Sequence, residues 1–598
     1  MKFKILAEYF EKIEKTASRL EMTEILAELF KEASVNEIDE IIYLSLGRLR
    51  PKYEGVEFNM AEKMMLRVAK TAYGVDLNKI REVFKRKGDL GEMLEEIGIK
   101  DKVLDKNLSV AGVYKRLMDI SVDEGQGSQE RKVQNMAILI RDLDKLSAKY
   151  VMRIPVNKLR LGFSDMTVLD ALSWMSKGDK SLRKDLERAF NVSVDIGKIA
   201  VVFKKKGLQG IGGIKVESGV PIRMAMAERL PNAEKMIEKL DVFAVEPKYD
   251  GLRLQIHLDK GKYLRLAGQE EMFGKAKKLV RIFSRNLDNM TAMFPDVAEA
   301  VEKLKVRTII LDGEAVGYDS KTNKWLPFQE TIQRKRKHGV SGKIKELPVK
   351  VIVYDILYLD GKSLLTKPFR ERRKILEQVM KKADSDPASR RGATASRGGL
   401  VLARQEIVSD VKDLRRLLKK YLKEGLEGVM CKKLTTEYQA GSRNFNWVKF
   451  KKTNESELAD TIDAVVMGYY AGKGRRSGFG IGAFLVGVRD KKGRIGSVAK
   501  IGTGLSDEQW KEIKRRADKV KIDKQDKRYI VDKNLKPDVW IRPEIVVEIM
   551  ADEITKSPIH AFSLALRFPR LVKFRDDKNL GQITNRKELE KIFKMQRK

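Results

Sequence analysis

The segment from Val242 to Leu258 constrains the fold of this chain more than any other part of the sequence. An apolar run, Val242–Val245, leads into Glu-Pro-Lys-Tyr-Asp-Gly (246–251), and alternation of apolar and polar residues resumes after it. This pattern predicts a strand, a sharp turn that carries Lys248, and a second strand. A single Lys-x-Asp-Gly occurs by chance in many long chains, so taken alone it is better explained as a hairpin with a solvated lysine.

The charge of the chain favours a polyanionic partner. The 598 residues contain 122 Lys and Arg against 85 Asp and Glu, which gives a net charge of +37. Nucleic acid is the favoured partner, and a membrane surface is the rival polyanion. No apolar run is long enough to span a bilayer, and the N-terminus does not resemble a signal peptide. We therefore expect no membrane contact and a cytoplasmic, nucleoid-associated location.

The content of cysteine and histidine excludes several kinds of site. Cys431 is the only cysteine, so neither a disulfide framework nor a cysteine-based zinc site can form. The three histidines, His257, His338 and His560, have no metal-ligand spacing. A reducing intracellular compartment is expected.

The pattern of apolar residues divides the chain into three parts. Residues 1–218 show helical periodicity, residues 219–453 mix strand and helix patterns, and residues 454–598 have the short strands and turns of a small β domain. A five-stranded OB barrel fits the size of the last part. We therefore expect a multidomain α+β protein with an all-helical domain, a mixed α/β domain and a C-terminal OB-fold β-barrel.

Individual elements can also be expected from periodicity. The first helical stripe is formed by Phe3, Leu6, Phe10, Ile13, Ala17 and Leu20. Strands are expected at 309–316, 349–359, 425–432, 445–451, 464–470, 483–488, 498–501 and 545–549. Residues 383–399 have loop composition and little apolar surface to bury, so we expect a disordered basic insertion there.

Charged residues on the expected strands suit chemistry on a nucleotide phosphate. Glu314 and Glu427 offer the oxygen ligands that Mg²⁺ prefers, and Lys449 and Lys451 alternate with apolar residues along one strand. A lysine amine is protonated at pH 7, and freeing it costs about 4–5 kcal/mol from its reference pKa. Nearby cations and a metal ion favour the neutral amine, which would let Lys248 attack a phosphate. Individually, the same residues are explained equally well as strand-edge carboxylates and a solvated strand face.

Seven motifs follow one another in a recognisable order. They are Glu-Pro-Lys-Tyr-Asp-Gly-Leu-Arg (246–253), Phe-Ser-Arg-Asn (283–286), Leu-Asp-Gly-Glu-Ala-Val (311–316), Tyr-Asp-Ile-Leu-Tyr-Leu-Asp-Gly (354–361), Glu-Gly-Val-Met (427–430), Trp-Val-Lys-Phe-Lys (447–451) and Leu-Arg-Phe-Pro-Arg (566–570). Over essentially the whole chain, this order resembles the ATP-dependent DNA ligases of the archaeal and eukaryotic replicative type. Leu-Pro-Phe-Gln-Glu (326–330) with Arg334 and Lys335 is similar to the same family.

The resemblance implies an enzyme that seals nicks in three steps. Lys248 attacks the α-phosphate of ATP to form lysyl-AMP with release of pyrophosphate. AMP then passes to the 5′-phosphate of the nick, and the 3′-hydroxyl displaces AMP to join the strand. The implied cofactors are ATP and Mg²⁺, with Mn²⁺ as an alternative, and the implied partner is nicked double-stranded DNA in replication, repair and recombination.

The resemblance also implies roles for the residues that bind the adenosine. Glu246 would read the adenine amine, and Tyr354 would stack on the base. Arg253 and Arg285 would hold the ribose and phosphate, and Lys432 would belong to the same nucleotide site.

The remaining roles concern the metal and the phosphates. Glu314 and Glu427 would serve the metal, and Lys449 and Lys451 would contact the α-phosphate. In the OB domain, the residues that would orient the leaving pyrophosphate are Arg567, Arg570 and Lys573. This last role requires the OB domain to move between steps, with a hinge near residues 452–454.

Some features depart from the family pattern, and two rival functions stay open. Residues 261–278 look like an insertion, which affects the alignment of Arg285. No clamp-binding motif is found near residues 105–108, so a sliding clamp is a partner by analogy only, and a monomer is expected. The zinc cysteines of NAD-dependent bacterial ligases are absent, which favours ATP. The rivals are an mRNA-capping guanylyltransferase and a non-catalytic clamp on nicked duplex.

Overall fold

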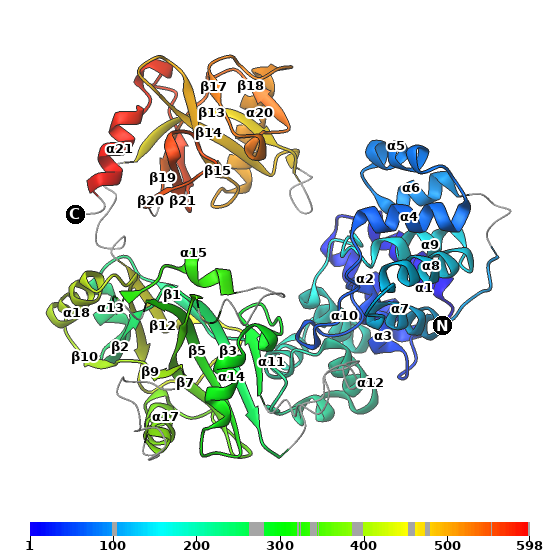
Figure 1. Cartoon of the computed structure of the whole chain (residues 1–598), viewed down its shortest axis with the longest axis horizontal. Helices are drawn as coiled ribbons and strands as arrows, with labels where there is room; N and C mark the ends of the chain where they lie inside the picture. Colours follow the sequence, from blue (N-terminus) through cyan, green and yellow to red (C-terminus); the bar gives the residue numbers. More distant parts are fainter. Residues whose placement is uncertain are drawn as a thin grey trace. The chain divides into compact units, whose positions relative to one another are not determined.

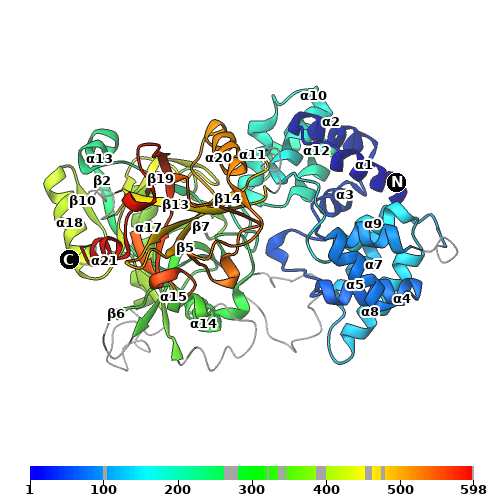
Figure 2. The same cartoon turned by 90° about the horizontal axis from the view of Figure 1, so that it is seen from above.

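The computed structural model divides into two compact units, Met1–Phe450 and Lys451–Lys598. Figures 1 and 2 show the elements of each unit. The described residues are 1–98, 104–261, 280–319, 322, 324–334, 344, 346–384, 399–451, 461–472, 479–551 and 553–595. The expected hinge at 452–454, nearly all of the expected insertion at 261–278 and most of the segment 383–399 lie outside them. Among the described residues, no helix combines the length and apolar character needed to cross a membrane.

The first unit begins with a helical region that has its own apolar core. Its elements are α1 (Phe3–Glu14), α2 (Arg19–Glu32), α3 (Ile38–Ser45), η1 (Lys52–Glu54), α4 (Glu62–Tyr73), α5 (Leu77–Lys87), α6 (Leu90–Ile97), α7 (Val110–Val122), α8 (Ser128–Arg141), α9 (Lys145–Arg153), α10 (Asp165–Lys177), α11 (Arg183–Ser193) and α12 (Ile196–Gly212). The all-helical prediction for this region is confirmed.

The expected first stripe is correct for α1 and wrong beyond it. Phe3, Leu6, Phe10 and Ile13 of α1 are fully buried, whereas Leu20 is half exposed. The helix ends at Glu14 because Ser18 starts a second helix, in which its side chain accepts the backbone N–H of Glu21. A serine in this position satisfies a donor that the first turn of a helix leaves unpaired, and periodicity alone does not reveal such a break.

The rest of the first unit contains two sheets. The five-stranded sheet has the order β1-β12-β11-β2-β10, with β1 (Met226–Arg229), β2 (Phe243–Lys248), β10 (Glu406–Val408), β11 (Gly428–Lys433) and β12 (Arg443–Lys451). The seven-stranded sheet has the order β4-β3-β5-β7-β8, with β6 paired to β5 and β9 paired to β7. Its strands are β3 (Leu252–Asp259), β4 (Val280–Ser284), β5 (Thr308–Asp319), β6 (Lys324–Trp325), β7 (Val349–Leu359), β8 (Lys362–Ser363) and β9 (Leu400–Leu402).

The turn after Lys248 joins these two sheets instead of forming a hairpin. Lys248 pairs with Gly428 in the five-stranded sheet, whereas Leu252 pairs with Ala315 in the other sheet. A side chain at Gly251 would place its Cβ 2.4 Å from the carbonyl oxygen of Ala315, so only glycine fits. The expected strand, turn and strand are present, but their hydrogen-bonding partners lie far away in the sequence.

Helices cover one face of each sheet. α13 (Ala233–Leu240) and α18 (Val411–Lys423) pack with the five-stranded sheet around one apolar cluster. α14 (Pro295–Glu302) and α17 (Phe369–Asp384) lie against the seven-stranded sheet and a second cluster. The short segments between the strands are η3 (Thr291–Met293), α15 (Phe328–Thr331) and η4 (Ile332–Arg334). α13, α14, α17 and α18 do not cover the opposite face of either sheet, and the candidate active site lies on those faces.

The second unit is rich in strands, as expected. Its larger sheet has eight strands, β13 (Ile462–Tyr470), β14 (Ala483–Arg489), β15 (Ile495–Ile501), β16 (Lys521–Ile522), β17 (Tyr529–Ile530), β18 (Val539–Ile541), β19 (Val546–Met550) and β22 (Arg570–Phe574). β20 (Glu553–Lys556) and β21 (Leu564–Arg567) form a separate pair, and the helical elements are α20 (Asp507–Lys519), α21 (Arg586–Met595), η7 (Lys533–Leu535), η8 (Ala561–Ser563) and η9 (Leu580–Gln582). The large sheet exceeds the five strands expected because strands of two or three residues are too short to show a period.

Candidate active site

Alternation along the five-stranded sheet brings its cationic residues to one face. Phe243 and Val245 of β2, like Val448 and Phe450 of β12, belong to the cluster under α13 and α18. Because successive residues of a strand point to opposite faces, the other face carries Glu246, Lys248, Lys432, Lys449 and Lys451.

The seven-stranded sheet turns a complementary face toward this one. Leu254, Leu311 and Val353 lie in the cluster beside α14 and α17, so the opposite face carries Arg253, Asp312, Glu314 and Tyr354. The two faces are in contact, since the Lys432 Nζ lies 4.5 Å from the centre of the Tyr354 ring. The Arg253 guanidinium likewise lies 5.4 Å from the ring of Trp447 on β12.

The expected nucleophile lies at the end of β2, beside a carboxylate. The Lys248 Nζ donates a hydrogen bond to Glu427, and the backbone N–H of Glu427 donates to the Lys248 carbonyl at 3.1 Å. Glu427 directly precedes β11, so the pairing of β2 with β11 brings both side chains together. Lys248 keeps a partly exposed amine.

A second ion pair lies deeper in the same face. The Lys432 Nζ lies 2.7 Å from a carboxylate oxygen of Glu246, and the amide of Gln405 donates to the other oxygen at 3.0 Å. Both charged side chains are almost completely buried. Burial lowers the pKa of Lys432, and the carboxylate of Glu246 opposes this change.

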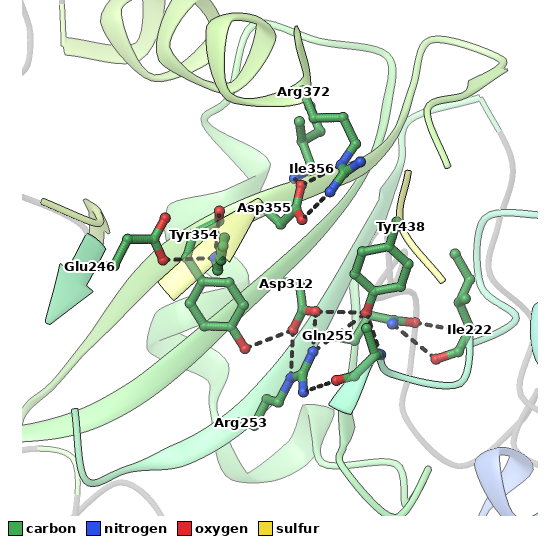
Figure 3. A network of polar contacts seen from close by, with 12 residues as sticks. Ile222, Glu246, Arg253, Gln255, Asp312, Tyr354, Asp355, Ile356, Arg372 and Tyr438 are labelled. Carbon is green, nitrogen blue, oxygen red and sulfur yellow. Dashed lines mark hydrogen bonds and ion pairs between the residues drawn. The ribbon is translucent and has the colours of Figure 1, made fainter. Parts of the chain in front are cut away.

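Asp312 is the centre of the polar network on the other sheet, as Figure 3 shows. Its fully buried carboxylate accepts two hydrogen bonds from Arg253, at 3.0 and 2.6 Å. It also accepts the hydroxyl hydrogens of Tyr354 at 3.0 Å and Tyr438 at 2.9 Å. Burial alone would lower the pKa of Arg253, but the Asp312 carboxylate raises it well above its ordinary value. Arg253 is therefore a fixed cation.

Glu314 has a different environment from Asp312, although both point to the same face of β5. Burial raises the pKa of Glu314 to about 7, while the charges of Lys248 and Arg253 oppose that rise. Glu427 is hydrogen-bonded to the Lys248 amine, and Glu314 is close enough for the charge of that amine to act on its pKa. Among the described residues, no group of three or more metal-binding side chains is present.

Comparison with known proteins identifies the family. A family model described as "ATP dependent DNA ligase domain" matches residues 224–451, "DNA ligase N terminus" matches residues 2–173, and "ATP dependent DNA ligase C terminal region" matches residues 477–578. A "Probable DNA ligase" of Dictyoglomus turgidum is 41% identical over 100% of this chain and 98% of its own length. The chain belongs to the ATP-dependent DNA ligases. It therefore uses ATP to seal nicks in duplex DNA.

Other relatives of the ligase agree with this assignment. "DNA ligase 2" of Thermofilum pendens is 38% identical, and "DNA ligase" of Sulfurisphaera tokodaii is 36% identical, each over 100% of this chain and 98% of the relative. A solved structure named "Pmar-Lig_Pre." has the same fold, with a TM-score of 0.51 and 18% identity over 96% of this chain and 99% of that chain.

The structure brings most of the expected nucleotide-binding residues of the ligase together. Lys449 and Lys451 are half-buried near the end of β12, on the sheet that carries Lys248. Arg285 is exposed in the turn after β4. Since Ser284 pairs with Leu254, this turn lies beside the first residues of β3 and therefore near Arg253.

The remaining expected residues belong to the second unit of the ligase. Arg567 ends β21, and Arg570 and Lys573 lie on β22. Lys573 lies 3.5 Å from Glu548 across the β19–β22 pair. Phe568, between the two arginines, is exposed and has a positive φ of 51°, so the backbone turns sharply there.

The sequence analysis missed the side chains that hold the expected nucleotide-binding residues in place. Asp312 stood inside a motif, two residues before Glu314, but received no role. Tyr438 and Gln405 stood outside every motif. The ring of Trp447 lies edge-on to both Tyr354 and Tyr438, at 6.0 and 5.7 Å between ring centres. The signal for Asp312 was its position on the same strand face as Glu314; no comparable signal marked Tyr438 or Gln405.

Proposed function

We propose that Lys248 is the nucleophile of the ligase. Its amine nitrogen attacks the α-phosphorus of ATP, a phosphorus–nitrogen bond forms, and the bond to the leaving pyrophosphate breaks. AMP then passes to the 5′-phosphate of a nick, and the 3′-hydroxyl oxygen displaces it. The observation that carries this proposal is that one face of the five-stranded sheet presents Lys248, Glu246, Lys432, Lys449 and Lys451.

The proton on the amine has an acceptor beside it. Glu427 accepts a hydrogen bond from Lys248 and is within reach to hold or pass on the proton that the amine must lose. Removing the proton from an ordinary lysine at pH 7 costs about 4–5 kcal/mol. The half-buried cations Lys449 and Lys451 favour the neutral amine and offset the charge of the phosphates.

Glu314 and Glu427 would hold a divalent cation, which we propose to be Mg²⁺, with Mn²⁺ as an alternative. Mg²⁺ is commonly held by one or two carboxylates together with substrate phosphates, so a pair of glutamates fits it better than a larger cage of side chains. When bound, the ion would neutralise charge on the phosphates during the transfer. Burial raises the pKa of Glu314 to about 7 although the charges of Lys248 and Arg253 oppose the rise, and a bound divalent cation would favour its ionised form.

Arg253 and Tyr354 are proposed to bind the adenosine in a preset geometry. The hydroxyl of Tyr354 is held by Asp312, which fixes the ring that would stack on the base. Arg253 is held by the same carboxylate and, at 2.6 Å, by the Ala225 carbonyl, with Arg285 in the neighbouring turn completing the ribose and phosphate contacts. Glu246 would accept a hydrogen bond from the adenine amine in place of the contact that its carboxylate now makes with Lys432 or Gln405.

We further propose that the domains are residues 1–218, 219–453 and 454–598. The helical domain and the OB-type domain would grip nicked duplex DNA, and Arg567, Arg570 and Lys573 would orient the leaving pyrophosphate. We propose that the ligase is a monomer. A sliding clamp stays a partner by analogy.

The deciding experiment follows a label from ATP to DNA. Wild type, Lys248→Ala and the charge-preserving Lys248→Arg are incubated with α-labelled ATP and Mg²⁺, and nicked duplex is then added. We expect a covalent label on wild type alone, discharged as the nick is sealed. Labelling of Lys248→Ala would refute the assignment of the nucleophile, and a label that nicked DNA never discharges would refute the proposed transfer to DNA.

A further inference from the structure

The second unit contains a basic pocket that none of the motifs includes. It has a volume of about 380 Å³ and lies between the hairpin that joins β14 to β15 and the first turn of α21. Five cationic side chains line it against two carboxylates. The cations are Lys491, Lys492, Arg494, Arg586 and Lys587, and the carboxylates are Asp490 and Glu590.

Both carboxylates are already engaged inside the pocket wall. Asp490 accepts the backbone N–H groups of Lys492 at 2.8 Å and Arg494 at 2.9 Å, and it also forms an ion pair with the Arg494 side chain. Glu590 pairs with Arg586 at 2.7 Å. In the described part of the chain, no ion pair joins Lys491, Lys492 or Lys587 to a carboxylate.

Two of the remaining lysines, Lys491 and Lys587, lie close together despite their like charges. Lys491 and Lys587 come from the hairpin and the helix, and the pKa of Lys491 is lowered by its contact with Lys587 and by the repulsion between the two ammonium groups. A bound anion between them would remove this repulsion.

The pocket is preformed by backbone contacts. Arg489, at the start of the hairpin, bridges Asn585, directly before α21, and its N–H donates to the Thr584 carbonyl at 3.4 Å. Gly493 closes the hairpin with a positive φ of 75°. Asn585 and Glu588 cap α21 mutually, at 2.8 and 3.1 Å, so the anion would be bound by side chains and not by the helix end.

A line of lysines continues from the pocket along α21. Lys587, Lys591 and Lys594 are exposed and are spaced four and three residues apart, which puts them on one side of the helix. Residues four apart are about 6 Å apart along a helix, so the line suits a ligand with a series of phosphates. A single free phosphate ion would contact only the pocket and not the lysines farther along the helix.

We propose that this pocket and the lysine line of α21 bind backbone phosphates of the DNA on which the ligase acts, outside its active site. Phosphate contacts of this kind carry no sequence information, but they add affinity and set the position of the protein on the duplex. Free pyrophosphate carries the same kind of phosphate groups as DNA. It is therefore the alternative ligand for this pocket, and the experiment must distinguish the two.

The test compares three double variants in binding to a nicked duplex that lacks the 3′-hydroxyl, over a range of salt concentrations. The pocket variant is Lys491→Gln with Lys587→Gln, and the line variant is Lys591→Gln with Lys594→Gln. The control is Lys511→Gln with Lys519→Gln, two exposed lysines of α20. In both views of the second unit, α20 lies away from α21 (Figures 1 and 2).

We expect the pocket variant and the line variant to bind DNA more weakly than wild type and with a smaller salt dependence, because each phosphate contact contributes about 0.9 to the slope of log K against log salt. A slope smaller by one makes the loss of affinity about fourfold greater at 50 mM than at 200 mM salt. The control should match wild type. Adenylation of Lys248 without DNA should be unchanged in all three variants.

Two results would overturn the proposal. If the DNA affinity and the salt slope of both the pocket variant and the line variant equal those of the control, the pocket does not bind DNA. If only the pocket variant changes, and it changes the inhibition of adenylation by pyrophosphate while the DNA slope stays that of wild type, the pocket binds free pyrophosphate. Thermal melting of each variant shows whether the fold is intact, and the single variants Lys491→Gln and Lys587→Gln give the same comparison if the double variant melts early.

Discussion

At the scale of single residues, one buried carboxylate holds in place the side chains that are proposed to bind the adenosine. Asp312 accepts hydrogen bonds from Arg253, Tyr354 and Tyr438, and its own side chain is fully buried. A buried carboxylate costs a large desolvation free energy unless charge and hydrogen bonds compensate it. Here the compensating groups include the two side chains proposed to hold ribose and base, so Asp312 is a positioning residue.

Replacing Asp312 with Asn should therefore weaken both stability and nucleotide binding. The change leaves Arg253 buried without its counter-charge, which typically costs about 3 kcal/mol or more of unfolding free energy. Urea unfolding measures this loss, and the KM for ATP in adenylation should rise together with it. Glu299→Gln, which removes the exposed ion pair with Lys303, is the control and should change stability by at most about 1 kcal/mol. An unchanged KM for ATP in Asp312→Asn would contradict the positioning role.

The two proposed metal-binding glutamates can be tested by titration of Mg²⁺. Glu314→Gln and Glu427→Gln should each need at least about tenfold more Mg²⁺ for half-maximal adenylation, since even an outer partner of a metal site typically contributes about 10- to 100-fold. EDTA should abolish adenylation by wild type. If neither variant shifts the Mg²⁺ requirement, the metal is held elsewhere.

At the scale of elements, the segment that enters the mixed α/β region is fastened to β3 by side chains. The amide of Gln255 exchanges hydrogen bonds with the backbone of Ile222, at 2.7 and 3.0 Å. The ring of His257 accepts the N–H of Gly219 at 3.1 Å, and its other nitrogen lies 2.9 Å from Gln255. Burial, with the nearby charge of Arg281, lowers the pKa of His257 to about 3. The contact therefore depends on a neutral histidine.

This histidine should make the fold sensitive to acid. The pKa of His257 is about 3 in the folded chain and 6.5 as the ordinary value, so below about pH 6.5 the unfolded chain binds a proton that the folded chain does not. The contribution of His257 to stability should fall with decreasing pH, by about 2 kcal/mol between pH 7 and pH 5. Urea unfolding at both pH values should show that lowering the pH is less favourable for the stability of wild type than for that of His257→Gln, by about this amount. Equal slopes in wild type and His257→Gln would show that His257 is not held neutral.

At the scale of the whole molecule, the proposed chemistry draws on both units. Lys248 lies in the first unit, and Arg567 and Arg570 lie in the second. If the two arginines act on the leaving pyrophosphate, they are needed when Lys248 reacts with ATP. They are not needed when a 3′-hydroxyl displaces AMP from DNA, because no pyrophosphate is present in that step.

Removing Arg570 should therefore separate the steps. Arg570→Ala should slow adenylation by about 10²-fold, the usual cost of removing a group that stabilises developing charge. Sealing of a nick that already carries 5′-AMP should continue at close to the wild-type rate. Arg542→Ala, at an exposed arginine of the same unit, is the control and should leave both steps unchanged. Equal losses in both steps would place Arg570 in DNA binding and not in pyrophosphate departure.

Local periodicity was enough to predict many elements, whereas the catalytic candidates came mainly from the resemblance of the motifs to a known family. β7 was predicted at its observed bounds, and β5 and β12 within a few residues, because alternation of apolar residues reports directly on which face of a strand is buried. The order of the motifs identified the family, and the family comparisons agree. Strand alternation and the sequence motifs both depend on residues that are close together in the sequence.

Pairing between distant segments was decided only by the tertiary structure. The turn after Lys248 was expected to have strands on both sides, but the local pattern could not show that these strands join different sheets. Asp312 receives its donors from residues 42 to 126 positions away, and sequence spacing carries no information about such contacts. The sequence by itself determined the residue types and strand faces of this ligase. Only the pairing of β5 with β3 and β7 decided which carboxylate would hold Arg253 and Tyr354, and only the pairing of β2 with β11 placed Glu427 beside the lysine, because burial and hydrogen bonding are properties of the assembled site.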